Sequence, residues 1–153
     1  MRILAIDPGP EQSAYCVYDT ETQTPMSWGK CDNLMALVHV NFADADRLAV
    51  EMVASYGMPV GAEVFATCVW AGRFIERWMP GDVRLVYRRD VKLHLCGDSR
   101  AKDANIRQAI IDRYGGKAKA IGLKATPGVL YGLSGDCWSA LGVAITAAET
   151  EAS

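Results

Sequence analysis

The sequence predicts an α/β fold with a mixed five-stranded sheet flanked by helices. Three strand-like segments near the N-terminus are joined by short polar connections, which is typical of an antiparallel meander. Two later strand-like segments are separated by a long helical segment, so we expect the first, fourth and fifth strands to run parallel. We find no internal repeat and no linker-like stretch, and therefore expect one domain over residues 1–153.

The strands are predicted from short apolar runs that are bounded by turn residues. The first run ends in Asp7 and is followed at once by Pro8-Gly9. The second and third flank a polar stretch over residues 20–24, so we expect them to be neighbours. The five expected strands cover residues 2–7, 13–19, 25–31, 47–53 and 83–87.

The helices are predicted from apolar spacing and from end signals. Asp32-Asn33 can cap a short helix, Pro80-Gly81 ends a long one, and Gly115-Gly116 ends a third. Residues 117–133 are rich in Lys, Gly and Pro, so we expect a loop there. The five expected helices cover residues 34–41, 62–78, 89–95, 103–114 and 136–149.

Composition excludes several classes of protein. Half of the residues are hydrophobic and 22% are charged, which is ordinary for a globular protein. No apolar stretch reaches the ~18 residues of a membrane span, and a strand follows Met1-Arg2 directly, so we expect no signal peptide. The five cysteines form no CxxC pair, which favours a reducing cytoplasm over a disulfide scaffold or a zinc site.

The charges are distributed unevenly along the chain. Residues 84–124 contain eleven basic and four acidic residues, a net charge of +7. The rest of the chain contains five basic and fourteen acidic residues, a net charge of −9. Such a segment is a candidate polyanion-binding face, and the alternative is a solvated basic surface that balances an acidic one.

Two acidic residues lie where folding alone explains them poorly. Asp7 ends a buried strand, and Glu51 lies inside the apolar run of the fourth strand. Burial of an ionised carboxylate without a partner costs several kcal/mol or more. A shared divalent metal ion is the simplest compensating charge. The alternative is that Asp7 caps a turn and that Glu51 pairs with an arginine.

The order of elements, together with the segment Ile-Leu-Ala-Ile-Asp-Pro-Gly over residues 3–9, resembles the RuvC-like Holliday junction resolvases. These have the ribonuclease H-like fold, with a Glu on the fourth strand and acids at the start of the last helix. Glu51 and Asp136 match these positions. The chain looks most like the short resolvase-like proteins of bacteriophages, and the segments that carry this resemblance are residues 51–61, 100–108 and 127–136.

The resemblance implies a two-metal site for Mg²⁺, with Mn²⁺ as a substitute. Asp7 would bridge both ions, while Glu51 and Asp136 would each favour one. Asp136 has an alternative role in complementing the dipole at the start of its helix. Ser139, a weaker possible ligand than a carboxylate, stands where the family has a second helix acid. The site would therefore run on three acids plus water, recruit Asp103 or Asp98, or be impaired. Asp103 has an alternative role as a helix-capping or first-turn acid.

The family places lysines of the basic segment beside the scissile phosphate, so Lys102 is the candidate for transition-state stabilisation. His94 is a candidate proton shuttle, a phosphate contact or a structural residue. The loop from Tyr56 to Gly61 would either wedge against DNA or pack on the core. The expected DNA-binding residues are Arg88, Arg89, Lys92, Arg100, Lys102, Arg107, Lys117, Lys119 and Tyr56.

The helix over residues 62–78 is more apolar than a single sheet-facing stripe requires, so we expect a homodimer through this helix. The alternative is that the helix is buried within the monomer. The resemblance implies a metal-dependent endodeoxyribonuclease that cleaves Holliday junctions or other branched DNA in the bacterial cytoplasm, during recombination or repair. One alternative is a non-catalytic junction-binding module, and another is ribonuclease H activity on RNA–DNA hybrids. An actin-like or sugar-kinase-like phosphotransferase would need a second, similar domain.

Overall fold

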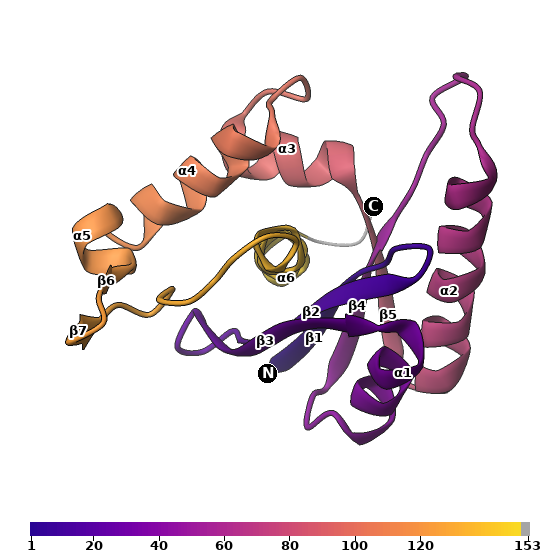
Figure 1. Cartoon of the computed structure of the whole chain (residues 1–153), viewed down its shortest axis with the longest axis horizontal. Helices are drawn as coiled ribbons and strands as arrows, with labels where there is room; N and C mark the ends of the chain where they lie inside the picture. The colour runs from indigo at the N-terminus through magenta and orange to yellow at the C-terminus, as the bar shows by residue number, and fades with distance from the viewer. Residues whose placement is uncertain (151–153) are drawn as a thin grey trace.

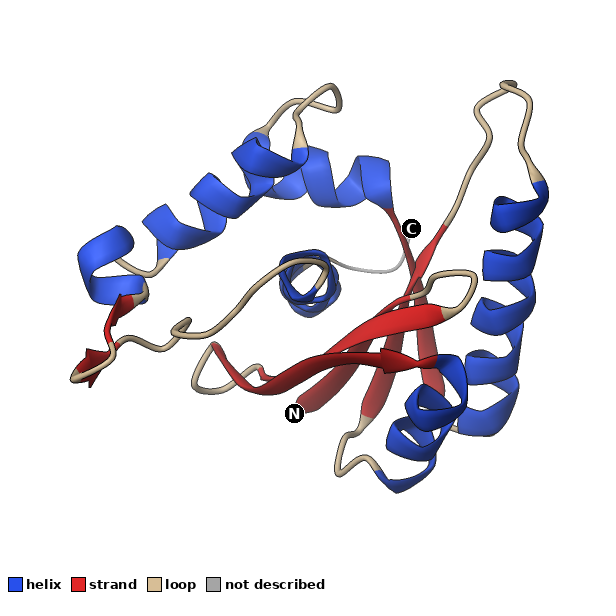
Figure 2. Cartoon of the chain, in the orientation of Figure 1, coloured by secondary structure: helices blue, strands red, loops and turns tan. Residues whose placement is uncertain are grey.

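A mixed five-stranded sheet forms the centre of the molecule, and its strand order is β3-β2-β1-β4-β5 (Figure 2). The computed structural model describes residues 1–150. β1 pairs antiparallel with β2, and β2 with β3, whereas β4 runs parallel to both β1 and β5. The predicted mixed sheet is therefore confirmed. The strands are β1 (Arg2–Asp7), β2 (Gln12–Asp19), β3 (Thr24–Asp32), β4 (Arg47–Met52) and β5 (Asp82–Tyr87).

Helices cover both faces of this sheet (Figure 1). Helices α1 (Asn33–Phe42) and α2 (Ala62–Trp78) pack on one face, and α6 (Cys137–Glu149) packs on the other. Beyond α6, a run of short elements forms an arm that extends away from the sheet. The arm consists of α3 (Arg88–Cys96), α4 (Asp103–Arg113), α5 (Lys117–Ala120), β6 (Gly122–Leu123) and β7 (Thr126–Pro127).

β1 is buried on both faces, as its unbroken apolar run indicates. Ile3 and Ala5 belong to the core under α6, and Leu4 and Ile6 belong to the core under α1 and α2. This alternation follows from the two-residue period of a strand. None of the four is more than 1% exposed, so Asp7 follows directly on the most deeply buried stretch of the sheet.

α6 is a core helix rather than an amphipathic surface helix. Ten of its thirteen residues are buried, which fits a helix that is apolar all round. A Cβ at Gly142 would lie 3.2 Å from Val91 of α3, so the glycine permits this close packing. α6 therefore starts at a fixed place above the sheet, and its first residues are held there.

Most predicted elements are found within one or two residues, including the cap of α1, where the Asp32 carboxylate accepts from Met35 N at 3.0 Å. The loop predicted over residues 117–133 is wrong. It contains the one-turn helix α5 and the β6–β7 hairpin, both too short to show a periodicity. Ala120 and Leu130 are fully buried. A Cβ at Gly128 would lie 2.2 Å from the Ala120 carbonyl oxygen, so glycine is required for this fold.

No helix within residues 1–150 is both long enough and apolar enough to cross a membrane.

Candidate active site

The carboxyl ends of β1 and β4 bring Asp7 and Glu51 to the same edge of the sheet. Ile6 is paired with Val50 in the parallel ladder, so Asp7 and Glu51 follow as the next residues of adjacent strands. The N-terminus of α6 reaches the same place and brings Asp136 and Ser139. In open α/β sheets, ligands bind at this carboxyl edge.

Asp7 is the most perturbed carboxyl group of this cluster. Its pKa is raised from 3.8 to about 7, first by burial and then by the negative charges of Glu51 and Asp136. Arg88 and a hydrogen bond from the Ser139 side chain lower that pKa by less. Glu51 and Asp136 therefore both lie close enough to repel Asp7, in a place where water screens the charges poorly.

Glu51 is partly compensated by an arginine. Burial raises the pKa of Glu51, and the nearby Arg88 opposes this shift. Arg88 Nη1 lies 3.4 Å from Glu51 Oε2, and only 13% of the Glu51 side chain is exposed. The alternative in which Glu51 pairs with an arginine is thus seen in this structure. Lys92 and Asp103 also lie near enough to shift the pKa of Glu51.

Asp136 is the residue that precedes α6, but its side chain makes no capping hydrogen bond within the described residues. It accepts instead from Lys30 Nζ of β3 at 2.6 Å. The charge and hydrogen bond of Asp136 raise the pKa of Lys30. Sequence reasoning missed Lys30. The strand register could have found it, because Lys30 pairs with Ala14, and Ala14 pairs with Asp7.

The two substitutes considered for the fourth acid lie in different places. Asp103, the first residue of α4, lies 2.5 Å from Arg88 Nη2, and its side chain is 80% exposed. Arg88 therefore stands between Asp103 and Glu51. Asp98 instead accepts from the backbone N–H of Arg100 at 2.8 Å.

The carboxylates of Asp7, Glu51 and Asp136 are of the type that binds magnesium, because Mg²⁺ prefers carboxylate oxygens and water. Within residues 1–150, however, no three acidic, histidine or cysteine side chains are gathered as ready ligands. Glu51 instead faces Arg88, and Asp136 faces Lys30.

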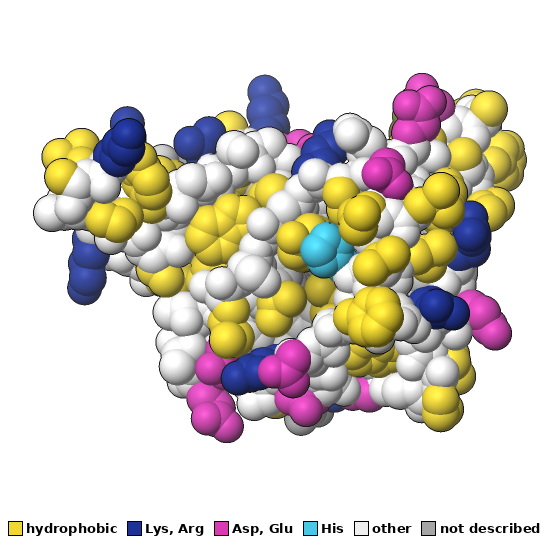
Figure 3. Space-filling view, turned by 60° about the horizontal axis from the view of Figure 1, so that its bottom comes forward, with side chains coloured by type: hydrophobic (Ala, Val, Ile, Leu, Met, Phe, Trp, Pro, Cys, Tyr) yellow, Lys and Arg dark blue, Asp and Glu magenta, His cyan; other side chains and the backbone are white. Residues whose placement is uncertain are grey.

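Some basic side chains of residues 84–124 pair within the protein, and others are exposed. Arg84 donates to the carbonyl oxygens of Ala147 and Thr150, Arg88 pairs with Glu51 and Asp103, and Arg113 pairs with Glu149. His94 Nε2 lies 2.8 Å from the same Glu149, so His94 takes part in this structural cluster. The exposed group includes side chains on the arm, which Figure 3 shows at the left. It consists of Arg89, Arg100, Lys102, Arg107, Lys117, Lys119 and Lys124.

The loop between β4 and α2 projects beyond the acidic edge of the sheet (Figure 1). Tyr56 is 63% exposed and Met58 is 72% exposed, so the loop does not pack on the core. Tyr56 and Gly57 adopt φ values of 47° and 80°, which give the tip its sharp turn. The loop starts two residues after Glu51, at the same end of β4 as the candidate site.

No protein-family model and no curated protein matches this sequence. Solved structures do match it. Thermus thermophilus RuvC superposes with a TM-score of 0.64, at 17% identity over 95% of this chain and 92% of that chain. RuvC of the same organism in complex with a Holliday junction substrate gives a TM-score of 0.68, at the same identity and coverage. The chain has the RuvC fold, which is ribonuclease H-like. At this identity, the similarity concerns the fold and not the activity.

Proposed function

We propose that this protein is a metal-dependent endonuclease that cleaves Holliday junctions or other branched DNA by phosphodiester hydrolysis. The observation that carries the proposal is Asp7, a partly buried carboxyl group at the carboxyl edge of a RuvC-like sheet, whose pKa is raised to about 7 beside two other acids. Glu51 and Asp136 add further negative charge there. Folding gains nothing from an acid that two other acids repel, whereas a site for divalent cations requires such a group of carboxylates.

Asp7, Glu51 and Asp136 are the proposed ligands of Mg²⁺, and Mn²⁺ could substitute. When bound, the divalent ions would help to activate a water, orient the phosphate and stabilise the leaving oxygen. Asp7 lies between the other two acids and is the proposed shared ligand. The Ser139 side chain orients the Asp7 carboxylate through its hydrogen bond. Ser139 thus supports the site without supplying a fourth carboxylate.

Lys102 is the proposed point charge beside the scissile phosphate. It directly precedes α4, next to Asp103, and its side chain is exposed. Lys92 is only partly exposed and lies near Glu51, so it is suited to a phosphate close to the acids. Tyr56, at the tip of the loop between β4 and α2, is the proposed wedge against unstacked bases at the branch point.

The exposed basic side chains of the arm are the proposed contacts for the DNA backbone outside the site. Such contacts position a duplex without reading its sequence, and they weaken as salt rises. Because the arm extends away from the sheet, it would follow one duplex arm of the junction (Figure 1). These proposed contacts are Arg89, Arg100, Arg107, Lys117 and Lys119. The partly buried Arg88 is a further proposed contact, beside the acids.

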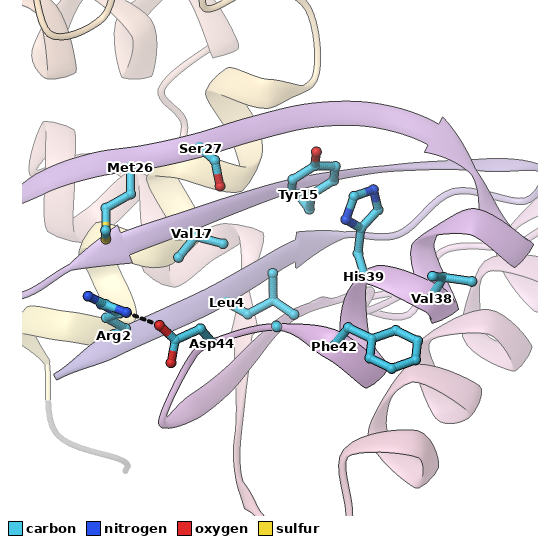
Figure 4. Close-up of a pocket in the computed structure, with 11 residues that line it drawn as sticks. Arg2, Leu4, Tyr15, Val17, Met26, Ser27, Val38, His39, Phe42 and Asp44 are labelled. Carbon is cyan, nitrogen blue, oxygen red and sulfur yellow. Dashed lines mark hydrogen bonds and ion pairs between the residues drawn. The ribbon is translucent and has the colours of Figure 1, made fainter.

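A homodimer through α2 is the proposed assembly, because symmetric cleavage of two strands needs two sites. Phe65 and Val69 of α2 are 61% and 62% exposed, and Phe42 of α1 is 78% exposed. A groove of about 780 Å³ between α1 and α2 is lined by Val38, Phe42 and Val69, among others. A second groove, of about 460 Å³, continues from Phe42 to the Tyr15–His39 ring stack (Figure 4). A partner subunit would cover this apolar face.

A non-catalytic junction-binding module is the second candidate, favoured by Ser139 in place of an acid and by the cations that hold Glu51 and Asp136. Ribonuclease H activity is a further alternative on the same fold. A single experiment separates the three. A four-way junction, a flap, a linear duplex and an RNA–DNA hybrid are incubated with Mg²⁺, Mn²⁺ or EDTA.

Junction cleavage that EDTA stops is the expected result. Binding without cleavage in either metal would favour the binding module, and cleavage of the hybrid alone would favour ribonuclease H. The proposal also treats residues 1–153 as one nuclease domain that acts in the cytoplasm of a bacterium or a phage-infected host. The phage origin is suggested by the motifs over residues 51–61, 100–108 and 127–136.

A further inference from the structure

Two of the three acids at the candidate site are each held by a cation from a different element. Arg88 Nη1 of α3 lies 3.4 Å from Glu51, and Lys30 Nζ of β3 lies 2.6 Å from Asp136. Asp7 lies between these two pairs and carries the strongly raised pKa. The two cations approach from opposite edges of the sheet. Lys30 lies on the edge strand β3, and Arg88 begins α3, which directly follows the other edge strand, β5.

We propose that Arg88 and Lys30 are built-in counter-ions that compete with the metal ions and thereby set the metal affinity of the site. This inference rests on the proposed function. A carboxylate oxygen that accepts from a cationic side chain must give up that contact to turn toward an ion beside Asp7. Each metal ion therefore has to displace one cation, and part of its binding free energy is spent on breaking an ion pair.

Arg88 has a second partner to which it can retreat. Its Nη2 lies 2.5 Å from Asp103, whose side chain is 80% exposed. Arg88 can release Glu51 and remain paired with Asp103, beside the site and facing solvent. A guanidinium in that position is suited to bind a DNA phosphate with two hydrogen bonds. Asp103 is thus a positioning residue that acts through Arg88.

Lys30 is more exposed to solvent than Arg88 and pairs with Asp136. Its side chain is 45% exposed, and Asp136 is 53% exposed, so displaced Lys30 can turn into water. The Lys30 pair is therefore the weaker competitor, since solvent screens half-exposed ion pairs. The Arg88 pair is the stronger one, because Glu51 is nearly buried.

The test is Mn²⁺ binding to the DNA-free protein, measured by calorimetry and by electron paramagnetic resonance of the free ion. We expect Lys30→Met to bind Mn²⁺ roughly three- to fivefold more tightly, as befits a half-exposed pair. Arg88→Met should bind about tenfold more tightly. Arg47→Met is the matched control, because Arg47 is a 28% exposed arginine that pairs with Asp82 at the opposite end of β4 from Glu51. Its affinity should stay within about twofold of wild type. Unchanged or weaker binding by both Lys30→Met and Arg88→Met would overturn the inference.

Asp103 needs a double variant, because Asp103→Asn should weaken Mn²⁺ binding whether Asp103 is a ligand or a partner of Arg88. If it acts through Arg88, the double variant Arg88→Met/Asp103→Asn will bind as tightly as Arg88→Met alone. If the double variant is weaker than Arg88→Met by the factor seen in the single Asp103→Asn, the positioning role is wrong.

Two further measurements keep the test informative if Arg88→Met folds poorly. Arg88→Lys retains the charge and should bind Mn²⁺ like wild type, and Lys30→Met probes the opposite edge of the sheet independently. Failure of the proposed function has a different signature. A wild-type protein that binds no Mn²⁺ would remove the nuclease proposal itself, whereas a wild type that binds Mn²⁺ no more weakly than the two Met variants removes only the counter-ion proposal.

Discussion

Replacement of Asp7 by Asn should stabilise the metal-free protein while abolishing cleavage. The pKa of Asp7 is raised from 3.8 to about 7 in the folded protein, chiefly by burial. The folded state therefore binds more protons than the unfolded state between these pH values, and the free energy of unfolding falls as pH rises through this window. Asparagine carries no charge in either state, so Asp7→Asn removes this loss.

The size of the effect follows from the shift. A shift from 3.8 to about 7 is about three pKa units, each about 1.4 kcal/mol, so the ionised carboxylate costs about 4 kcal/mol at pH 8. At pH 5 the folded carboxyl group is mostly protonated, and the cost is only about 1–2 kcal/mol. The gain from Asp7→Asn should therefore grow by about 2–3 kcal/mol between pH 5 and pH 8. Loss of favourable hydrogen bonding to Ser139 reduces the net gain by about 1 kcal/mol.

Urea denaturation of the wild type and Asp7→Asn in EDTA, at pH 5, 6.5 and 8, measures this difference. Asp19→Asn is the control, because the pKa of Asp19 is lowered rather than raised. The largest cause is the hydrogen bond that its carboxylate accepts from the backbone N–H of Glu21. That variant should gain no stability at any of these pH values. Junction binding by Asp7→Asn should stay near that of the wild type, while metal-dependent cleavage disappears.

Two results would refute the reasoning. An Asp7→Asn protein that is no more stable than wild type at pH 8, or whose advantage does not grow above pH 5, would show that Asp7 is not a costly buried charge. A variant that still cuts junctions at the wild-type rate in Mg²⁺ would show that Asp7 is not the shared metal ligand.

Three further predictions concern other parts of the molecule. Lys102→Met should slow single-turnover junction cleavage by about 10²-fold with little change in junction affinity, because Lys102 is proposed to contact the reacting phosphate. Lys124→Met is the control and should leave the rate unchanged. Val69→Asp should convert a dimer to a monomer in sedimentation velocity. Leu123→Asp is the control, at a residue that is 71% exposed, and should remain a dimer. Equal sedimentation of both variants would argue against the α2 interface. Gly128→Ala should lower the free energy of unfolding by about 1–3 kcal/mol in urea denaturation, because the new Cβ would clash with the Ala120 carbonyl oxygen. Gly61→Ala is the control and should leave stability unchanged, because a Cβ at Gly61 would have no described atom within 4 Å.

Much of the site could be anticipated from the sequence because its acids stand in conspicuous local contexts. Asp7 follows an apolar run that is buried on both faces, and Glu51 interrupts another such run. A buried charge in a strand is costly wherever it occurs, so these two residues stand out without knowledge of the fold. The strand directions were also predictable, because short polar connections favour antiparallel neighbours and a long helical segment permits a parallel crossover.

The ion pairs at the candidate site could not be predicted in this way. Lys30 and Asp136 are separated by 106 positions, and Arg88 and Glu51 by 37. Arg84 belongs to the basic segment, yet it donates to carbonyl groups at the end of α6. A count of charges is the same for a side chain that points inward and for one that points into solvent.

The sequence by itself determined the mixed sheet and the acids at its carboxyl edge, because burial and strand alternation are local constraints that leave a local pattern. Only the tertiary structure decided which cation faces which acid, and that residues 117–127 fold into a helix and hairpin rather than a loop. Those outcomes depend on strand register and on the packing of α3 and α6 around Gly142, which bring together residues that are far apart in the chain. Long-range pairing of charges has no periodicity, so only the folded geometry reveals it.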